Sequence, residues 1–153
     1  MLKIVDSHEL WYLFNDDPVR PHISANFRTS LGREAFALYN QDASEIRAVI
    51  CCAYTNDVPI TEHELDLWSQ QAAADDTVPP SVAVFYTVWS YDRGAGRDIV
   101  LAARDYARDV RGCTRFVTLS PLTEMAERFH IKNGAVLLAR GNTCQNFEYP
   151  ATS

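Results

Sequence analysis

The run SVAVFYTVW at residues 81–89 is the most strand-like segment of the sequence, and it leads directly into the glycine-containing turn SYDRGAGRD at 90–98. The residues that follow, IVLAARDYARDV, place apolar side chains at helical spacing. This order predicts a buried strand, a tight turn and a helix. Backbone amides at the beginning of such a helix usually face an anion.

Two common phosphate-binding motifs do not fit this turn. A Walker A loop requires G-x-x-x-x-G-K-[ST], and the turn contains no lysine. A dinucleotide-binding G-x-G-x-x-G loop has a third glycine where this sequence has Ile99. The structural alternative is that Gly94 and Gly96 serve only as the flexible residues of a tight turn.

Hydrophobic periodicity along the chain predicts alternating strands and helices. Their order indicates one mixed α/β sheet with helices packed on its faces, in a single domain that spans residues 1–153. A Ser-Pro pair at 120–121 is a typical helix start, with an N-cap followed by proline at the first position. Strands are expected at 2–6, 34–40, 46–55, 81–89, 115–119, 135–140 and near 142–150, and helices after Ser7, at 62–74, at 97–110 and from 120 onward.

Composition excludes several classes of protein. The net charge is −6 with no basic cluster, so nucleic-acid binding is not expected as the main activity. No apolar run reaches the roughly 18 residues of a membrane span, and the beginning of the chain lacks a secretory signal, so a cytoplasmic location is expected. The four cysteines form no C-x-x-C pair, and neither a metal site nor a disulfide framework is expected.

Two segments resemble one known family. Arg93–Asp98, RGAGRD, is similar to motif A of the GNAT (GCN5-related) N-acetyltransferases, (Q/R)-x-x-G-x-(G/A). The segment TEMAERFHIKNGA at 123–135 resembles the family's motif B, roughly N-x-x-A-x-x-h-Y-x-K-x-G-F. Both motifs occur in the family's order, and the resemblance covers about residues 34–149. The second motif also resembles GNAT-type proteins carried by tailed phages.

The resemblance implies a GNAT-like mixed central sheet flanked by helices and splayed between the fourth and fifth strands to admit acetyl-CoA. It implies direct transfer of an acetyl group from acetyl-CoA to a primary amine of a small molecule or protein, without a metal. The amides of the turn would hold the coenzyme pyrophosphate at a helix N-terminus. The residues expected to bind acetyl-CoA are Val88, Ser90, Arg93, Gly94, Ala95, Gly96, Arg97, Asp98 and Thr123.

His130 is the candidate catalytic residue. It stands where the family often has a tyrosine that protonates the departing coenzyme A thiolate. Histidine can act as an imidazolium acid or, when neutral, relay a proton. The alternative is a packing histidine with one ring nitrogen bonded inside the protein. Candidates for the general base are Asp57, Glu62 and Glu64, although Glu64 also fits a helix capping box.

Departures from the motifs favour a second hypothesis. Asp98 replaces the small last residue of motif A, and its carboxylate would repel a diphosphate unless it pairs with an arginine such as Arg93 or Arg97. Thr123 replaces an asparagine. The alternative function is a non-catalytic GNAT-fold module that contacts a partner protein, with Trp68 on the helix at 62–74 as the expected contact or homodimer surface.

Overall fold

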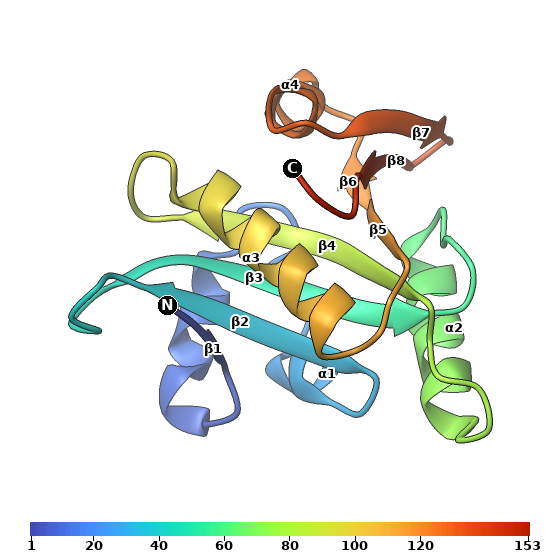
Figure 1. The fold of residues 1–153 in the computed structure, drawn as a ribbon, viewed down its shortest axis with the longest axis horizontal. Coiled ribbons are helices and arrows are strands. Elements are labelled where there is room, and N and C mark those ends of the chain that lie inside the picture. The colour runs from blue at the N-terminus through green and yellow to red at the C-terminus, as the bar shows by residue number, and fades with distance from the viewer.

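The computed structural model describes residues 1–153 and contains one mixed sheet with helices on both faces (Figure 1). The strands lie in the order β1-β2-β3-β4-β5-β8-β6, and β7 also pairs with β8. Only β4 and β5 are parallel neighbours. The strands are β1 (Leu2–Ile4), β2 (Arg33–Tyr39), β3 (Ile46–Thr55), β4 (Val82–Ser90), β5 (Arg115–Thr118), β6 (Ser120–Pro121), β7 (Val136–Arg140) and β8 (Cys144–Tyr149).

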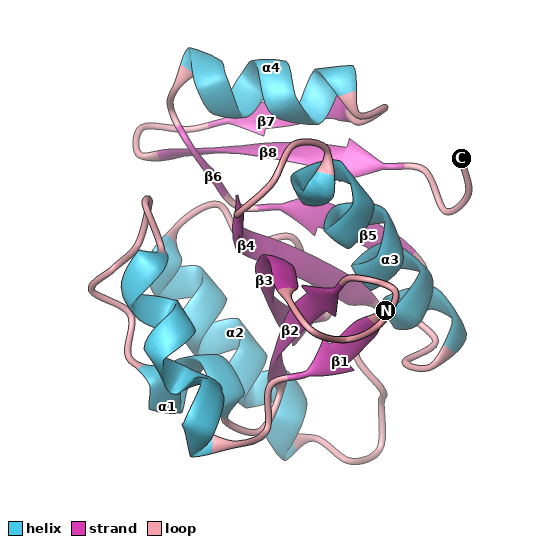
Figure 2. Cartoon of the chain, turned by 90° about the vertical axis from the view of Figure 1, so that its left-hand side faces the viewer, coloured by secondary structure: helices cyan, strands magenta, loops and turns pink.

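The helices divide between the two faces of the sheet (Figure 2). α3 (Ala95–Asp109) packs on one face, where its apolar stripe meets side chains of β2, β3 and β4. The 3-10 helix η1 (His8–Asp16), α1 (Ala25–Thr29) and α2 (Glu62–Ala74) lie on the other. α4 (Glu124–Lys132) lies beside β7. No helix combines the length and the apolar composition needed to cross a membrane.

The alternation of side chains along the central strands explains this arrangement. Cys51 and Cys52 are adjacent and both buried, and they point into the cores on opposite faces. The strand predicted at 34–40 is confirmed as β2, and the helix at 62–74 is confirmed as α2. A sheet covered on both faces needs such nearly continuous apolar strands.

The helix start predicted at Ser120-Pro121 is wrong. These residues form β6, which pairs with Cys144 and Gln145 of β8. Ser120 is buried, and its hydroxyl lies 2.8 Å from that of Thr118, so it does not cap a helix. Thr123 takes that role, because its Oγ1 accepts a hydrogen bond from the amide of Ala126 at 3.2 Å.

β4 and β5 separate halfway along β4. Their pairing covers Val82–Phe85 against Arg115–Thr118, followed by a hydrogen bond from the Leu119 amide to the Phe85 carbonyl at 3.1 Å. From Tyr86 onward, β4 remains paired with β3 and has no partner on β5. The predicted splay between the fourth and fifth strands is therefore confirmed.

A β-bulge accompanies this separation. Phe85 pairs with Cys52 and Thr87 pairs with Cys51, so Tyr86 is an extra residue on β4. A bulge bends its strand and increases the local twist. The irregularity thus lies at the residue where β4 turns away from β5.

Candidate functional site

A cleft of about 280 Å³ lies where β4 and β5 separate. One wall is the free half of β4, and the opposite wall comes from α4 and the segment that joins it to β5. The loop between η1 and α1 covers one end. The lining residues are Pro18–Arg20, Phe85–Ser90, Gly96, Leu119–Pro121, Thr123, Met125, Ala126, Phe129 and His130.

A larger and more open hollow of about 660 Å³ lies between η1 and the end of β4. Two pairs of its polar side chains are already engaged with each other. The Tyr91 hydroxyl donates to Asp16 at 2.6 Å, and Arg47 pairs with Asp92 at 3.0 Å. Neither the turn at 93–98 nor the segment at 123–135 contributes a residue to this hollow, whereas both contribute to the cleft beside β4. That cleft is therefore the better candidate site.

The N-terminus of α3 provides backbone donors at one end of the cleft. Gly94 precedes the helix with a φ of 84°, a left-handed conformation that favours glycine. The amides of Gly96 and Arg97 have no hydrogen-bond acceptor in the turn. Free amides and the positive end of the helix dipole suit a phosphate group.

Gly96 also allows α3 and α4 to approach each other. A Cβ at this position would lie 3.1 Å from Cε1 of Phe129, closer than normal packing allows. Phe129 belongs to motif B, so the two motifs meet at this contact. The turn and α4 therefore form one continuous surface beside β4.

The structure divides the residues predicted to bind acetyl-CoA into two groups. Val88, Ser90, Gly96 and Thr123 line the cleft itself. The others belong to the turn, where Ala95 is buried and the remainder are exposed. The exposed residues are Arg93, Gly94, Arg97 and Asp98.

Asp98 pairs with an arginine that the sequence did not indicate. Its Oδ2 lies 3.3 Å from Nη1 of Arg47, at the beginning of β3, and the same guanidinium holds Asp92. The pairing expected with Arg93 or Arg97 is wrong, because neither forms an ion pair within the chain. Arg47 is adjacent because β3 and β4 are antiparallel, which places the beginning of β3 beside the turn.

His130 lies in the wall of the cleft and is buried. Its Nδ1 is 2.7 Å from the hydroxyl of Tyr149, and its ring stacks on Phe147. Burial lowers the pKa of His130 to about 4, so the imidazole is neutral at pH 7.

The contact with Tyr149 selects a tautomer. Tyr149 is buried, and burial raises the pKa of its phenol, which therefore keeps its proton. The hydroxyl has no acceptor other than Nδ1 of His130, and leaving it unpaired would cost free energy. Nδ1 therefore accepts from Tyr149, and Nε2 carries a proton that makes no hydrogen bond within the protein.

Of the three candidate bases, only Glu62 approaches the cleft, through its contact with Arg20. Glu64 belongs to the start of α2: its amide donates to Oγ1 of Thr61, and its Oε1 accepts from the amide of Ile60. Asp57 lines a separate hollow near α2. Tyr54, on β3, does not line the cleft, and its hydroxyl donates to Glu34.

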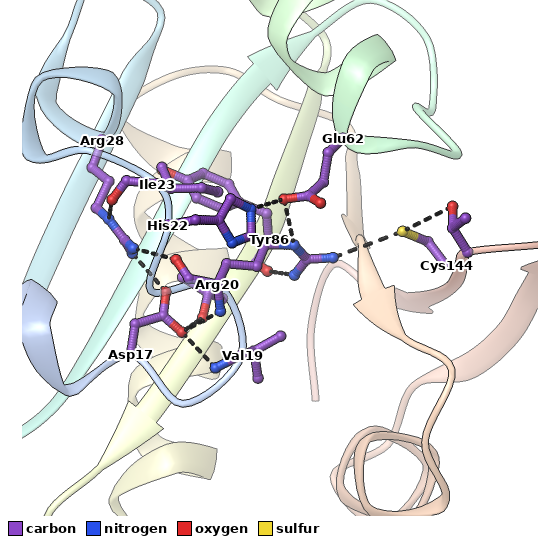
Figure 3. A network of polar contacts seen from close by, with 11 residues as sticks. Asp17, Val19, Arg20, His22, Ile23, Arg28, Glu62, Tyr86 and Cys144 are labelled. Atoms are coloured by element: carbon purple, nitrogen blue, oxygen red, sulfur yellow. Dashed lines mark hydrogen bonds and ion pairs between the residues drawn. The ribbon is translucent and has the colours of Figure 1, made fainter.

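Sequence reasoning missed a buried polar network between η1 and α1 (Figure 3). Asp17 and Arg28 form an ion pair at 2.8 Å with both side chains fully buried. Asp17 also accepts hydrogen bonds from the amides of Val19 and Arg20 and from Thr87. Burial opposes ionisation, but these hydrogen bonds lower the pKa of Asp17 overall. The only sequence signal was an acidic residue before proline, which is typical of any loop.

No protein-family model and no curated protein matches the sequence. Several solved structures match the fold of this chain. The chain is 19% identical to malonyl-CoA decarboxylase from Agrobacterium vitis, with a TM-score of 0.62 over 84% of this chain and 35% of that protein. It therefore spans about a third of the length of the malonyl-CoA decarboxylases that it matches.

Two further structures match over more of their own length. Tetrahymena GCN5 is 10% identical, with a TM-score of 0.51 over 84% of this chain and 75% of that one. A mutant of the toxin AtaT, bound to the C-terminus of the antitoxin AtaR and acetyl-CoA, is 17% identical, with a TM-score of 0.58 over 99% and 92%. With the parallel β4–β5 pair that opens at Tyr86, these likenesses show that the chain has the GNAT fold.

Proposed function

We propose that this chain is an N-acetyltransferase that moves an acetyl group from acetyl-CoA to a primary amine. One observation carries the proposal: the cleft between the separated halves of β4 and β5 joins the free amides of the α3 N-terminus to the N–H of a neutral histidine. The similarity to a toxin structure that contains acetyl-CoA supports the same ligand.

The α3 N-terminus would hold the coenzyme pyrophosphate through the amides of Gly96 and Arg97. Arg93 and Arg97 are exposed and free of ion pairs, so both can add charge-assisted hydrogen bonds. Arg47 draws the carboxylate of Asp98 to itself, which reduces the repulsion that Asp98 would otherwise exert on a diphosphate.

Acetyl-CoA supplies an activated thioester, and transfer to an amine requires that the sulfur accept a proton. The Nε2–H of His130 is the donor that lines the cleft. In a relay it would pass to the sulfur as Nδ1 takes the phenolic proton of Tyr149, and the proton that the amine releases as the amide forms would return to the His130–Tyr149 pair. Among the two roles considered for His130, the neutral relay fits the lowered pKa and the imidazolium acid does not.

A matched pair of glycine variants tests coenzyme binding. Gly94 and Gly112 both have positive φ, at 84° and 73°, and neither has a heavy atom near the place of a Cβ. Either change to alanine costs about 1–2 kcal/mol of backbone strain. Only Gly94→Ala should weaken acetyl-CoA binding, by about tenfold, through displacement of the turn amides.

The measurement is calorimetric titration of each variant and of the wild type with acetyl-CoA. Equal affinity in both variants would remove the α3 turn from the site. No heat and no rise in melting temperature at millimolar acetyl-CoA in the wild type would overturn the enzyme proposal. With binding established, His130→Phe should lower turnover with an amine library, and unchanged turnover would exclude His130 from the chemistry.

The second candidate is the non-catalytic module that contacts a partner protein. The likeness to AtaT bound to its antitoxin AtaR supports a protein partner for this fold. Coenzyme binding without turnover on any amine, combined with unchanged coenzyme binding in His130→Phe, would favour this candidate. The homodimer stays a prediction, which sedimentation velocity can check.

A further inference from the structure

Arg20 is a buried cation in the wall of the cleft. It belongs to the loop between η1 and α1, and Asp17 holds that loop through the amides of Val19 and Arg20, both at 2.9 Å. Only 4% of Arg20 is exposed. Its guanidinium extends from the loop past β4 toward Cys144 of β8 (Figure 3).

The guanidinium of Arg20 has fewer acceptors than its burial demands. Of its five N–H groups, one donates to the Tyr86 carbonyl, one to Sγ of Cys144 at 3.8 Å, a weak acceptor, and Nε faces Glu62 at 3.3 Å, which leaves one N–H on each Nη without an acceptor. Arg28, in the same segment, donates to the oxygens of Ile23, Asp17 and Arg20. Buried polar groups normally have their hydrogen bonds satisfied, so Arg20 has donors to spare for a ligand.

The charge of Arg20 is also only partly balanced. The buried carboxylate nearby, Asp17, pairs with Arg28. Glu62 lies 3.3 Å from Nε of Arg20, but its side chain is 45% exposed and it also contacts His22 at 2.9 Å. Solvent screens the charge of Glu62, whereas the side chain of Arg20 is only 5% exposed.

The position of Arg20 specifies which part of a ligand it would meet. Ser90 and Gly96 lie at the end of the cleft that would hold the pyrophosphate. Arg20 contacts Tyr86, four residues back along β4, which corresponds to about 13 Å of strand. Arg20 therefore lies toward the end of the cleft where the thioester and the acceptor would meet, next to the bulge at Tyr86.

We propose that Arg20 binds a carboxylate next to the reacting thioester. The carboxylate belongs either to the acyl group of a dicarboxylic acyl-CoA or to an amino-acid acceptor, and a planar guanidinium suits both. This inference rests on the proposed function, because it places the acyl end of the coenzyme at Tyr86. A simple cationic amine, such as a polyamine, would be repelled at this point.

Calorimetry with coenzyme A, acetyl-CoA, malonyl-CoA and succinyl-CoA tests the acyl source. The acceptor source is tested by turnover of acetyl-CoA with β-alanine against propylamine and with glycine against methylamine. A carboxylate preference of at least about tenfold is expected in one of the two arms. Binding of coenzyme A with no such preference in either arm would overturn the carboxylate site alone, whereas no binding of any coenzyme would overturn the proposed function.

Two variants assign the preference to Arg20. Arg20→Gln should bring the ratio of dissociation constants, or of turnover rates, close to one, and a retained ratio would overturn the proposal. Each ratio compares ligands with and without a carboxylate on the same variant. A variant that binds all ligands more weakly would therefore keep its ratio unchanged. If Arg20→Gln does not fold, Glu62→Gln decides: loss of the competing carboxylate should raise the preference, and a lowered preference would contradict the assignment.

Discussion

Arg20 and Arg28 are both buried arginines of one short segment, yet their surroundings differ. Arg28 has a buried carboxylate and two carbonyl oxygens, so its charge and its hydrogen bonds are satisfied within the protein. Arg20 has one carbonyl, one sulfur and a half-exposed carboxylate. A similar contrast separates Asp17, which has several hydrogen-bond partners, from His130, whose side chain has one, at Nδ1. Burial alone therefore does not distinguish a structural arginine from a ligand-binding one, whereas the hydrogen-bond partners within the protein differ between these two.

The largest expected effect comes from removing the satisfied arginine. Arg28→Met should destabilise the fold by about 3–5 kcal/mol, because it leaves Asp17 as a buried charge without a cation. Urea unfolding measures the change. The double variant Asp17→Asn/Arg28→Met should recover part of the loss. A loss of unfolding free energy below about 1 kcal/mol would mean that this ion pair contributes little to the stability of the fold.

His130 should produce a pH-dependent stability. Its pKa is about 4 in the folded protein and about 6.5 when unfolded, so the unfolded chain binds more protons between these values. Stability is therefore complete above pH 6.5 and falls as pH decreases toward 4, by up to about 3 kcal/mol. Urea unfolding at pH 7, 6, 5 and 4.5 checks this. His130→Phe should show a flatter profile, and an unchanged slope would mean that another group titrates.

Arg20→Gln should cost less than Arg28→Met, about 1 kcal/mol. The glutamine amide can still donate to the Tyr86 carbonyl, and the released Glu62 is half exposed and can be hydrated. Urea unfolding of the two variants side by side gives the comparison directly. Equal losses of unfolding free energy in the two variants would contradict the distinction between Arg20 and Arg28.

Arg47→Gln should change stability least, within about 0.5 kcal/mol, because its ion pairs with Asp92 and Asp98 are exposed. It should nevertheless weaken acetyl-CoA binding a few-fold, since Asp98 then faces the diphosphate without a cation. The effect should shrink at high salt. Titration of Arg47→Gln/Asp98→Asn is the control, and failure to restore affinity would show that Asp98 is irrelevant to the coenzyme.

Local patterns predicted most of the elements. The alternation in β3 and β4 and the stripe on α3 depend only on neighbouring residues. The error at Ser120-Pro121 has a different origin. Its cap pattern is locally sound, but pairing with Gln145 and Cys144, more than twenty residues away, decides its conformation. The same reason explains Asp98, whose partner Arg47 is 51 residues distant.

The candidate site shows the same division. The glycine turn and His130 were found because their motifs are local, and the structure brings both to the walls of one cleft. Arg20 was missed because its neighbours come from β4, α2 and β8, and no spacing in the sequence brings these together.

The sequence by itself determined a strand, a tight glycine turn and a helix whose first amides lack helical partners, because these follow from the flexibility of glycine and from side-chain periodicity. Only the tertiary structure decided which charges are satisfied. The bulge at Tyr86, the tautomer of His130 and the spare donors of Arg20 each depend on contacts between distant segments. Hydrogen-bond saturation is a property of packed neighbours, and a linear pattern does not contain it.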